Sequence, residues 1–317
     1  MAGSLDFHIA HRQRPVKTRF LVISDTHGLE TLAKDTPSHS VDVVIHCGDL
    51  TTESKLEEYK ASIRLLHTIN APLKIAIAGN HDFTMDIPTF QRKVADVKPP
   101  LDPTLVQQTY GYEGEARKLF DREVGITFLD EGTHEFRLGN GASLRVYASP
   151  YTPSLGDWGF QYNPDHGHDF SIHNVDVAIT HGPPKGIMDM SYSAERAGCP
   201  FLFEAIARAR PRMHCFGHIH EGWGAKLISW RQTSSAKPSH LTGIDNERSM
   251  TIEKLSTIRE KVAKIPAGAF STSHCFSDPS PLKMGLQTLF VNAAIEGEKA
   301  LPLQPAWIVD LDLPPGS

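Results

Sequence analysis

The chain has 317 residues, of which 40% are hydrophobic and 22% are charged, and a formal net charge of -5. These values are typical of globular proteins with one or two domains and exclude a disordered or fibrous chain. Lysine and arginine are scattered, so the sequence offers neither a basic groove for nucleic acid nor a cationic face for a membrane. No stretch approaches the ~20 apolar residues of a membrane helix. We expect neither nucleic acid nor membrane as a partner.

The cysteines and the N-terminal residues indicate the compartment. The four cysteines form no CxxC pair and lie far apart along a chain much longer than a disulfide-stapled domain; they are Cys47, Cys199, Cys215 and Cys275. The first twenty residues lack the continuous apolar segment of a signal peptide. We expect reduced thiols and an intracellular, cytoplasmic protein.

Short apolar runs rich in valine and isoleucine recur along the chain and end at Gly, Asp or Asn. Such runs predict buried strands, here residues 19–25, 41–49, 74–80, 143–150, 175–182, 213–220 and 288–294. After the second run, apolar residues recur every three or four positions and predict a helix, at Leu56, Tyr59, Ile63, Leu66 and Ile69. Thr51 or Thr52 would cap this helix, and Pro72 would mark its end. The alternation favours an α/β layered core with much parallel pairing.

Three regions interrupt this alternation. Residues 86–115 are expected to form a loop over one face, and residues 152–174 are rich in aromatic residues and histidine. Residues 229–286 have polar ends around one helical pattern and are interpreted as an insertion or cap. That pattern is made by Ile252, Leu255, Ile258 and Val262.

We therefore expect one domain over residues 19–311 that contains this insertion or cap. Residues 1–18 would be an N-terminal arm, and residues 312–317 a C-terminal tail. The sequence contains no internal repeat.

Side chains that bind metals follow the carboxyl ends of the predicted strands, where sites form in open α/β sheets. The clusters are SDTHG with Asp25 and His27, CGDL with Asp49, GNHD with Asn80, His81 and Asp82, THGPP with His181, and FGHIH with His218 and His220. Each cluster alone could be a turn, a surface histidine or a pair of core histidines. Together they would require carboxylate, carboxamide and imidazole groups at five strand ends by coincidence, so we interpret them as oxygen and nitrogen ligands for divalent ions.

This order of motifs, DxH, GD, GNH(E/D), H and GHxH, resembles that of the calcineurin-like metallophosphoesterase superfamily. Finer signatures, including IHCGDLT, IAGNHD, THGPP, FGHIHEG and the late FVNAA, are similar to the subgroup of the brain metallophosphoesterase-domain proteins and their fungal relatives. The resemblance covers about residues 19–227 and 286–311. It implies a β-sandwich flanked by helices, in αββα layers.

The resemblance also implies a ligand set for two divalent ions. One ion would be held by Asp25, His27, Asp49 and His220, and the other by Asp49, Asn80, His181 and His218. Asp49 would bridge the two and count, with His81, among the catalytic residues. The mixed donors make Mn, Fe or Zn plausible metals. Two ions roughly 3.5–4 Å apart would activate a bridging hydroxide for attack on phosphorus.

His81 follows a ligand without being one. It would face the leaving oxygen, as general acid or as a stabiliser of phosphoryl charge. Asp82 would orient a neighbouring ligand or have a structural role.

The function that follows is a dinuclear metal-dependent phosphoric ester hydrolase acting on a small-molecule substrate, with a small or nucleotide-like phosphodiester favoured. Three alternatives stay open: a phosphomonoesterase, a metal site recruited to a specialised reaction, and a non-catalytic metal-binding scaffold. The native metal, the physiological substrate and the oligomeric state do not follow from the sequence.

Other histidines and cysteines carry weaker hypotheses. His166, His168 and His173 lie in a segment that either lines the substrate entrance or forms a polar surface loop. Cys47 and His46 are interpreted as core residues. His274 and Cys275 resemble a ligand pair only superficially.

Overall fold

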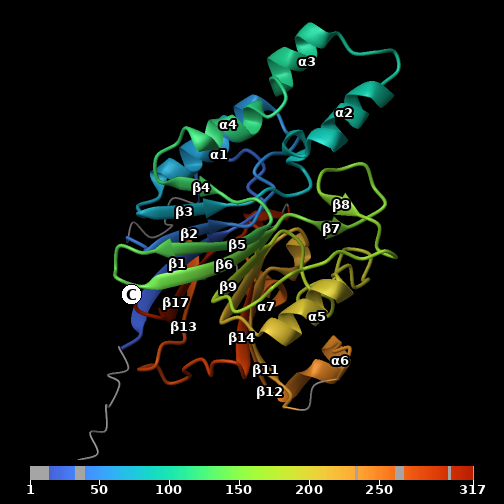
Figure 1. Cartoon of the computed structure of the whole chain (residues 1–317). Helices are drawn as coiled ribbons and strands as arrows, with labels where there is room; N and C mark the ends of the chain where they lie inside the picture. Colours follow the sequence, from blue (N-terminus) through green and yellow to red (C-terminus); the bar gives the residue numbers. More distant parts are fainter. Residues whose placement is uncertain (1–13, 33–39, 233–234, 261–267, 299–300, 317) are drawn as a thin grey trace, which may run out of the picture.

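The computed structural model describes residues 14–32, 40–232, 235–260, 268–298 and 301–316. Each of the seven predicted apolar runs contains a strand, and these strands belong to two larger sheets (Figure 1). The first sheet has the order β13-β17-β1-β2-β3-β4. Its strands are β1 (Val16–Ile23), β2 (Val43–His46), β3 (Leu73–Ala76), β4 (Ile126–Phe128), β13 (Ala269–Ser273) and β17 (Ala306–Leu313).

The second sheet has the order β12-β11-β14-β10-β9-β6-β5. Its strands are β5 (Gly132–Arg137), β6 (Ser143–Ser149), β9 (Val177–Thr180), β10 (Met213–Phe216), β11 (Gly224–Trp230), β12 (Ile244–Lys254) and β14 (Gln287–Asn292). Two small sheets pair β7 (Thr152–Pro153) with β8 (Gln161–Tyr162), and β15 (Glu296–Glu298) with β16 (Leu301–Leu303).

The centre of each large sheet is parallel. Strands β1, β2, β3 and β4 pair in parallel order, with Phe20 opposite Val43 and Val43 opposite Leu73. In the other sheet β10 lies parallel to both β9 and β14. Because parallel strands end at the same edge, the loops that follow β1, β2 and β3 are neighbours, as are those that follow β9 and β10.

The helices of the described residues are α1 (Leu56–Thr68), α2 (Ile87–Asp96), α3 (Pro103–Tyr110), α4 (Glu115–Asp121), α5 (Pro200–Ala209), α6 (His240–Gly243) and α7 (Leu255–Glu260), with 3-10 turns η1 (Phe83–Met85) and η2 (His220–Gly222). Helices α1, α4 and α5 cover the outer faces of the two sheets, whereas α7 packs into the core between them. Within the described residues, no helix is long and apolar enough to cross a membrane.

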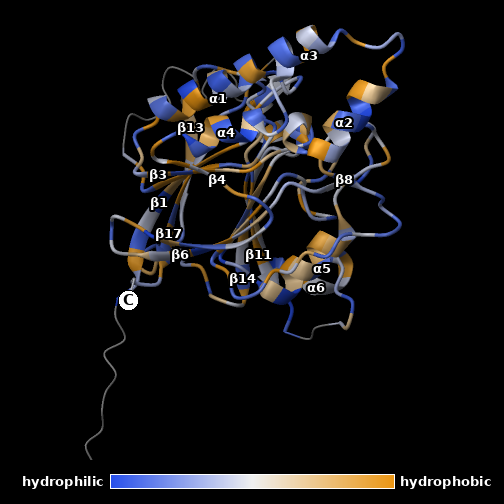
Figure 2. Cartoon of the chain, turned by 45° about the horizontal axis from the view of Figure 1, so that its top comes forward, coloured by the Kyte–Doolittle hydropathy of each residue, from blue (hydrophilic) through white to orange (hydrophobic). Residues whose placement is uncertain are grey.

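Three apolar clusters define the layers. Phe20 and Ile45 pack against Val177 and Val291 between the two sheets. Apolar residues of α1 and α4 cover the outer face of the first sheet, and those of α5 cover the outer face of the second. Figure 2 shows orange residues gathered in the interior and blue turns on the outer helices. The predicted α/β class with αββα layers is confirmed, because each sheet buries both faces.

The predicted helix after the second strand is α1, but its expected cap is wrong. The N-cap is Lys55, whose backbone N–H donates to the Glu58 carboxylate at 3.0 Å. Thr51 instead donates its hydroxyl to Asp82 at 2.8 Å. The loop after β2 therefore continues further than the sequence pattern suggested, because its polar groups bind the loop after β3.

Residues 86–115 were expected to form a loop, and this is wrong in part because α2 and α3 lie there. Each helix begins at an aspartate whose carboxylate accepts a backbone N–H: Asp86 from Thr89 at 3.3 Å and Asp102 from Thr104 at 2.8 Å. Proline follows within the first turn of each helix. Aspartate before proline is a helix-start signal that the sequence did contain.

Residues 229–286 include strands of both large sheets. Strand β12 pairs with β11, and β13 pairs with β17. Ile252 lies in β12, whereas Leu255 and Ile258 belong to α7 and are buried in the core between the sheets. Val262 lies outside the described residues. Whether this region also acts as a cap stays a prediction.

Candidate metal centre

The residues expected to bind metal follow strands of both sheets at one edge of the sandwich. Asp25 follows β1, Asp49 follows β2, and Asn80 follows β3. His181 follows β9, and His218 and His220 follow β10. The structure thus brings together side chains from five loops of two sheets.

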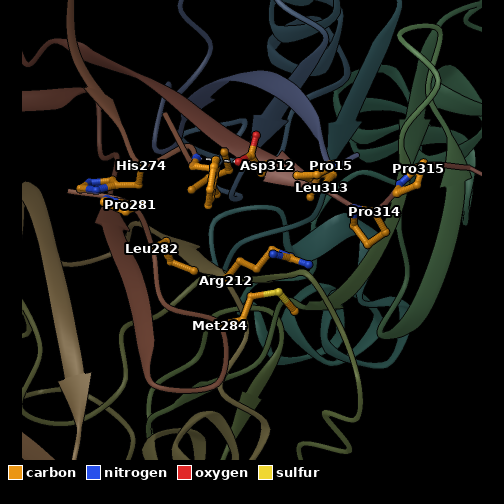
Figure 3. Close-up of a pocket in the computed structure, with 12 residues that line it drawn as sticks. Pro15, Arg212, His274, Pro281, Leu282, Met284, Asp312, Leu313, Pro314 and Pro315 are labelled. Carbon is orange, nitrogen blue, oxygen red and sulfur yellow. Dashed lines mark hydrogen bonds between the residues drawn. The ribbon is translucent and has the colours of Figure 1, made fainter. Parts of the chain in front are cut away.

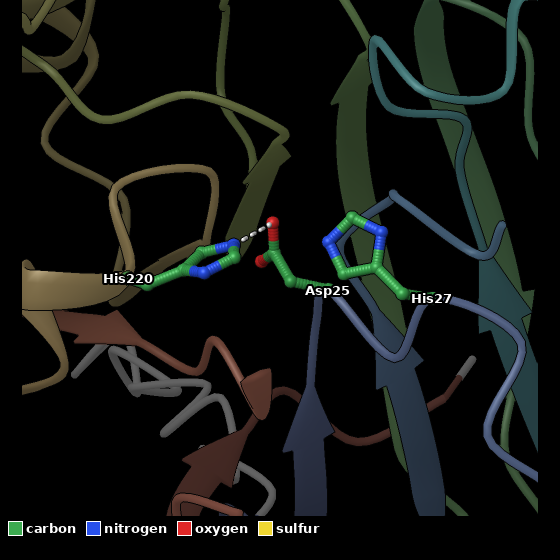
Figure 4. A group of neighbouring side chains, drawn as sticks. All are labelled: Asp25, His27 and His220. Atoms are coloured by element: carbon green, nitrogen blue, oxygen red, sulfur yellow. Dashed lines mark hydrogen bonds and ion pairs between the residues drawn. The ribbon is translucent and has the colours of Figure 1, made fainter. Parts of the chain in front are cut away.

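The first group contains Asp25, His27 and His220, which offer one donor atom each, all within 4.8 Å of one another. Figure 4 shows Asp25 between the two imidazole rings, with His220 Nε2 3.3 Å from Asp25 Oδ1. Asp25 is fully buried, and its carboxylate also accepts the His218 backbone N–H at 3.0 Å. The His27 Nδ1 lies 2.9 Å from the Thr51 carbonyl oxygen.

The second group contains Asp49, His181 and His218, again with all donor atoms within 4.8 Å. His181 Nε2 lies 3.3 Å from Asp49 Oδ2 and 2.9 Å from Asn80 Oδ1. The same Asp49 oxygen is 3.9 Å from His27 Nε2 in the first group. Asp49 therefore lies between the two groups.

The spacing of the donor atoms is compatible with metal binding in each group. Ligands about 2.1 Å from one ion, at angles between tetrahedral and octahedral, lie roughly 3.0–3.4 Å apart, and His220–Asp25 and His181–Asp49 are both 3.3 Å apart. His181 Nδ1 lies 3.0 Å from the Cys47 carbonyl oxygen, and His27 Nδ1 is likewise placed against a carbonyl. These contacts leave both Nε2 atoms for a metal. His27 Nε2 is buried and makes no hydrogen bond.

The backbone is held in an uncommon conformation at these residues. Asp25, His27, Asp49 and His218 have φ values of 53°, 45°, 53° and 66°. The left-handed region is uncommon for residues other than glycine and is concentrated at functional sites, where the surrounding structure offsets its cost. Here the strand-end loops turn sharply so that their side chains converge.

Two motif glycines permit this convergence. A Cβ at Gly79 would collide with the Asp49 carboxylate and lie 2.7 Å from the His181 ring. A Cβ at Gly217 would collide with Asp25. Glycine is therefore required by the close approach of a ligand carboxylate to the neighbouring backbone.

Strong electrostatic coupling holds the two carboxylates ionised. Burial by itself would raise the pKa of Asp49, but the charge and hydrogen bond of His181 lower this pKa to about 2. Burial would also raise the pKa of Asp25, but the hydrogen bond and the charge of His220 lower this pKa below its usual range. Burial would lower the pKa of His181, yet Asp49 raises it to about 9. A bound cation would take the place of the protons on these histidines, because a metal is ligated by neutral imidazole and ionised carboxylate.

His81 lies beside the first group without joining either group. Its backbone N–H donates to Asp49 Oδ1 at 2.8 Å, and its Nδ1 lies 2.7 Å from the Thr52 carbonyl oxygen. The ring meets the His27 ring edge-on at 4.9 Å and packs on Trp158 at 4.1 Å between centroids. These contacts hold the imidazole at the edge of the site.

Asp82 joins the loops after β2 and β3. Its carboxylate accepts backbone N–H groups from Gly79, Leu50 and Thr51 at 2.8–3.1 Å. Burial, together with the charge of Asp49, raises its pKa to about 7. Asp82 therefore positions the loop that carries Asn80 and His81.

Three other histidines considered from the sequence lie outside both groups. His168 Nε2 lies 2.7 Å from Glu131, and its ring stacks on Tyr151 at 4.5 Å. His46 is buried, with Nε2 2.8 Å from the Thr26 hydroxyl. His274 lies 2.9 Å from both Thr272 Oγ1 and the Ser280 carbonyl oxygen. These contacts give each imidazole a structural partner.

Glu296 was missed by sequence reasoning. It begins β15 shortly after the FVNAA motif, and its carboxylate oxygen lies 3.0 Å from His27 Nε2. The available signal was an acidic residue shortly after another strand of the second sheet, β14. Trp158 lies in the aromatic-rich segment of residues 152–174, for which the sequence predicted no contact with His81.

Two pockets of about 300 Å³ lie at different edges. One is next to the metal groups and is lined by Tyr192, His218, His220, Glu221, Glu296, Gly297 and Gln304. The other, in Figure 3, is lined largely by apolar and proline residues around Arg212 and contains none of the candidate ligands. It lies where β1 and β10 begin, and so at the edge opposite the metal groups.

Fold and site together define an α/β sandwich with paired Asp/His groups at one edge. The family model for calcineurin-like phosphoesterases matches residues 18–222, which is more than half of the chain. The chain therefore belongs to the calcineurin-like phosphoesterase family.

Several known proteins are similar to part of this chain. Metallophosphoesterase domain-containing protein 1 of Homo sapiens is 33% identical over 226 residues, which cover 66% of this chain and 63% of the human protein. Probable rhamnogalacturonate lyase C of Emericella nidulans is 31% identical over 216 residues, 67% of this chain but 18% of that protein. A UPF0046 protein of Caenorhabditis elegans is 29% identical over 222 residues, 67% of this chain and 53% of that protein. The match thus spans less than two thirds of each of these relatives.

Similarity to solved structures is more distant. TT1561 of Thermus thermophilus has 14% identity and a TM-score of 0.39, over 66% of this chain and 84% of that chain. Purple acid phosphatase PPD1 from yellow lupin has 8% identity and a TM-score of 0.37, over 94% of this chain and 55% of that chain.

Proposed function

We propose that this chain is a metal-dependent phosphoesterase that hydrolyses a small or nucleotide-like phosphodiester. The observation that carries the proposal is the position of Asp49, whose Oδ2 lies 3.3 Å from His181 Nε2 and 3.9 Å from His27 Nε2. One carboxylate next to two imidazole groups is the arrangement needed to bridge two ions.

In this proposal Asp25, His27, Asp49 and His220 hold one divalent ion. The second is held by Asp49, Asn80, His181 and His218. When bound, such ions supply an activated water and neutralise charge on the phosphoryl group. The mixed oxygen and nitrogen donors suit Mn, Fe or Zn.

His81 has a separate task in this proposal. Because its Nδ1 is placed against the Thr52 carbonyl oxygen, Nε2 is the nitrogen left for the substrate. A histidine there donates a proton to the leaving oxygen or stabilises phosphoryl charge. Trp158 packs on the ring and restricts its rotation.

The surroundings favour a diester over a monoester. The described residues that line the pocket beside the ligands include Glu221 and Glu296 but no lysine or arginine. A monoester carries up to two negative charges at neutral pH, whereas a diester carries one. A site whose cations are only its metals and histidines is better suited to the singly charged group.

The chain's thiols are consistent with a cytoplasmic site of action. All four cysteines are buried and free in the structure. Free thiols of this kind persist in a reducing compartment.

The test is a comparison of bis-p-nitrophenyl phosphate with p-nitrophenyl phosphate, on protein purified without chelator and analysed for metal. We expect about two divalent ions per chain and a higher kcat/KM for the diester. A higher value for the monoester would establish the phosphomonoesterase alternative. Full metal content without turnover of either ester, or of a panel of cyclic nucleotides, would indicate a scaffold or a recruited reaction.

A further inference from the structure

Glu296 contacts the first metal group from a part of the chain outside the five motifs. Its Oε2 lies 3.0 Å from His27 Nε2 and 3.8 Å from His220 Nδ1. The contact with His27 is close in distance but does not meet hydrogen-bond geometry, since His27 Nε2 has no hydrogen-bond partner. A short contact without a hydrogen bond is what two ligands of one ion show, because both direct their lone pairs at the metal.

The backbone of Glu296 is fixed to the ligand loop. Its N–H donates to the Asp25 carbonyl oxygen at 3.2 Å, and the preceding Ile295 N–H donates to the Ser24 carbonyl oxygen at 2.8 Å. On the other side, the Gln304 amide nitrogen donates to the Glu296 carbonyl oxygen at 2.9 Å and to that of His220 at 3.2 Å. The carboxylate thus extends from a backbone position set by Asp25 and His220.

Folding stability gives no reason for this placement. The Glu296 side chain is 51% exposed and that of His27 is 10% exposed. Ion pairs at such exposure contribute little to folding stability and are screened by salt. A half-exposed glutamate also keeps enough rotamer freedom to complete a coordination shell.

We propose that Glu296 is an additional carboxylate ligand of the ion held by Asp25, His27 and His220. The inference rests on the proposed two-metal function and deepens it. The distance of 3.0 Å to His27 Nε2 equals the separation of two adjacent ligands about 2.1 Å from one ion. The added oxygen makes this position richer in oxygen than the other and favours Mn over Zn.

The experiment measures Mn²⁺ binding by the full chain, by chelator competition and elemental analysis, in the parent and three variants. Glu296→Gln removes the charge, and Glu296→Asp keeps the charge but withdraws the carboxylate by one methylene. Glu221→Gln is the matched control, because Glu221 lines the same pocket without belonging to either group. We expect both Glu296 variants to bind one of two ions about 10–100-fold more weakly, while Glu221→Gln binds as the parent does.

The outcomes separate this inference from the proposed function. Parent affinity at both positions in Glu296→Gln overturns the inference and leaves the two-metal function standing. Parent affinity in Glu296→Asp with weakened binding in Glu296→Gln shows an effect of charge alone, which also overturns direct ligation. A parent protein without bound metal overturns the proposed function itself.

Discussion

The two edges of the sandwich use polar groups in opposite ways. At the carboxyl ends of the parallel strands, Asp25, Asp49 and His181 are buried together, and His27 Nε2 lacks a hydrogen bond. Nearer the other edge, the carboxylate of Asp310 on β17 is paired with Lys17 and Arg19 on β1. The same two sheets thus end in one edge that gathers the candidate metal ligands and one whose carboxylate is paired with basic side chains.

This difference indicates which of the two edges carries the function. Left-handed backbone at non-glycine residues and close-packed like charges both cost free energy of folding. Both occur at the edge that carries Asp25 and Asp49. At the opposite edge Asn174 and Arg210 also have left-handed backbone, but proline, apolar side chains and satisfied ion pairs surround them. Substitutions at the first edge should therefore change metal content and turnover, and those at the second should change stability.

Replacing the shared carboxylate should have the largest effect. Asp49→Ala removes the group next to both histidine sets, so metal content should fall from about two ions per chain towards zero. Activity should fall by roughly 10³-fold or more, as for loss of a principal catalytic group. Elemental analysis is the direct measurement. An undiminished metal content in this variant would contradict the bridging role of Asp49 and the predicted difference between the two edges.

His81→Ala should separate catalysis from metal binding at the same edge. Since His81 is outside both ligand groups, both ions should remain while activity falls by roughly 10²–10⁴-fold. The loss should be smaller for nitrophenyl esters, whose leaving groups need little protonation. Comparing kcat for good and poor leaving groups checks this, and an equal loss for both would argue against the acid role.

The opposite edge should respond only in stability. The Asp310 carboxylate accepts hydrogen bonds from Arg19 Nε at 2.7 Å and Arg19 Nη2 at 2.9 Å, and it pairs with Lys17 Nζ at 2.8 Å. The Asp310 side chain is 7% exposed. Asp310→Asn should lower the free energy of unfolding by about 1–2 kcal/mol, because a charge-assisted bidentate pair is lost. Urea unfolding measures this value. Metal content and kcat should match the parent, and a loss of bound metal would contradict the separation of the two edges.

The smallest effect concerns pH. Burial would raise the pKa of Asp310, but the hydrogen bonds from Arg19 and Lys17 lower it below the ordinary carboxyl value. A lowered pKa stabilises the fold above the unfolded value of about 4, and this contribution is lost as pH falls through the folded value. The difference in unfolding free energy between parent and Asp310→Asn should therefore shrink below about pH 4. A constant difference would mean that the charge of Asp310 contributes nothing.

Much of the candidate site could be predicted because its signals are local. Asp25, Asp49 and His181 each follow an apolar run that becomes a strand, and the parallel order of these strands brings their ends together. The assignment of a single domain to residues 19–311 and the ligand roles themselves remain predictions. The expected loop over residues 86–115 instead contains α2 and α3, each of which begins at an aspartate with proline within the next two residues.

The sequence by itself determined the α/β class and the chemical groups that follow each strand. Both can be read from consecutive residues, because an apolar run and the polar residues directly after it are local features of the chain. Only the tertiary structure decided that Glu296 contacts His27 and that Trp158 packs on His81. No motif spacing encodes these contacts. They arise because β14 lies parallel to β10 and delivers the following loop to the metal edge, and because the loop containing Trp158 folds back onto the one after β3. Contacts between distant segments depend on how the sheets stack, and stacking is fixed by packing of the whole core.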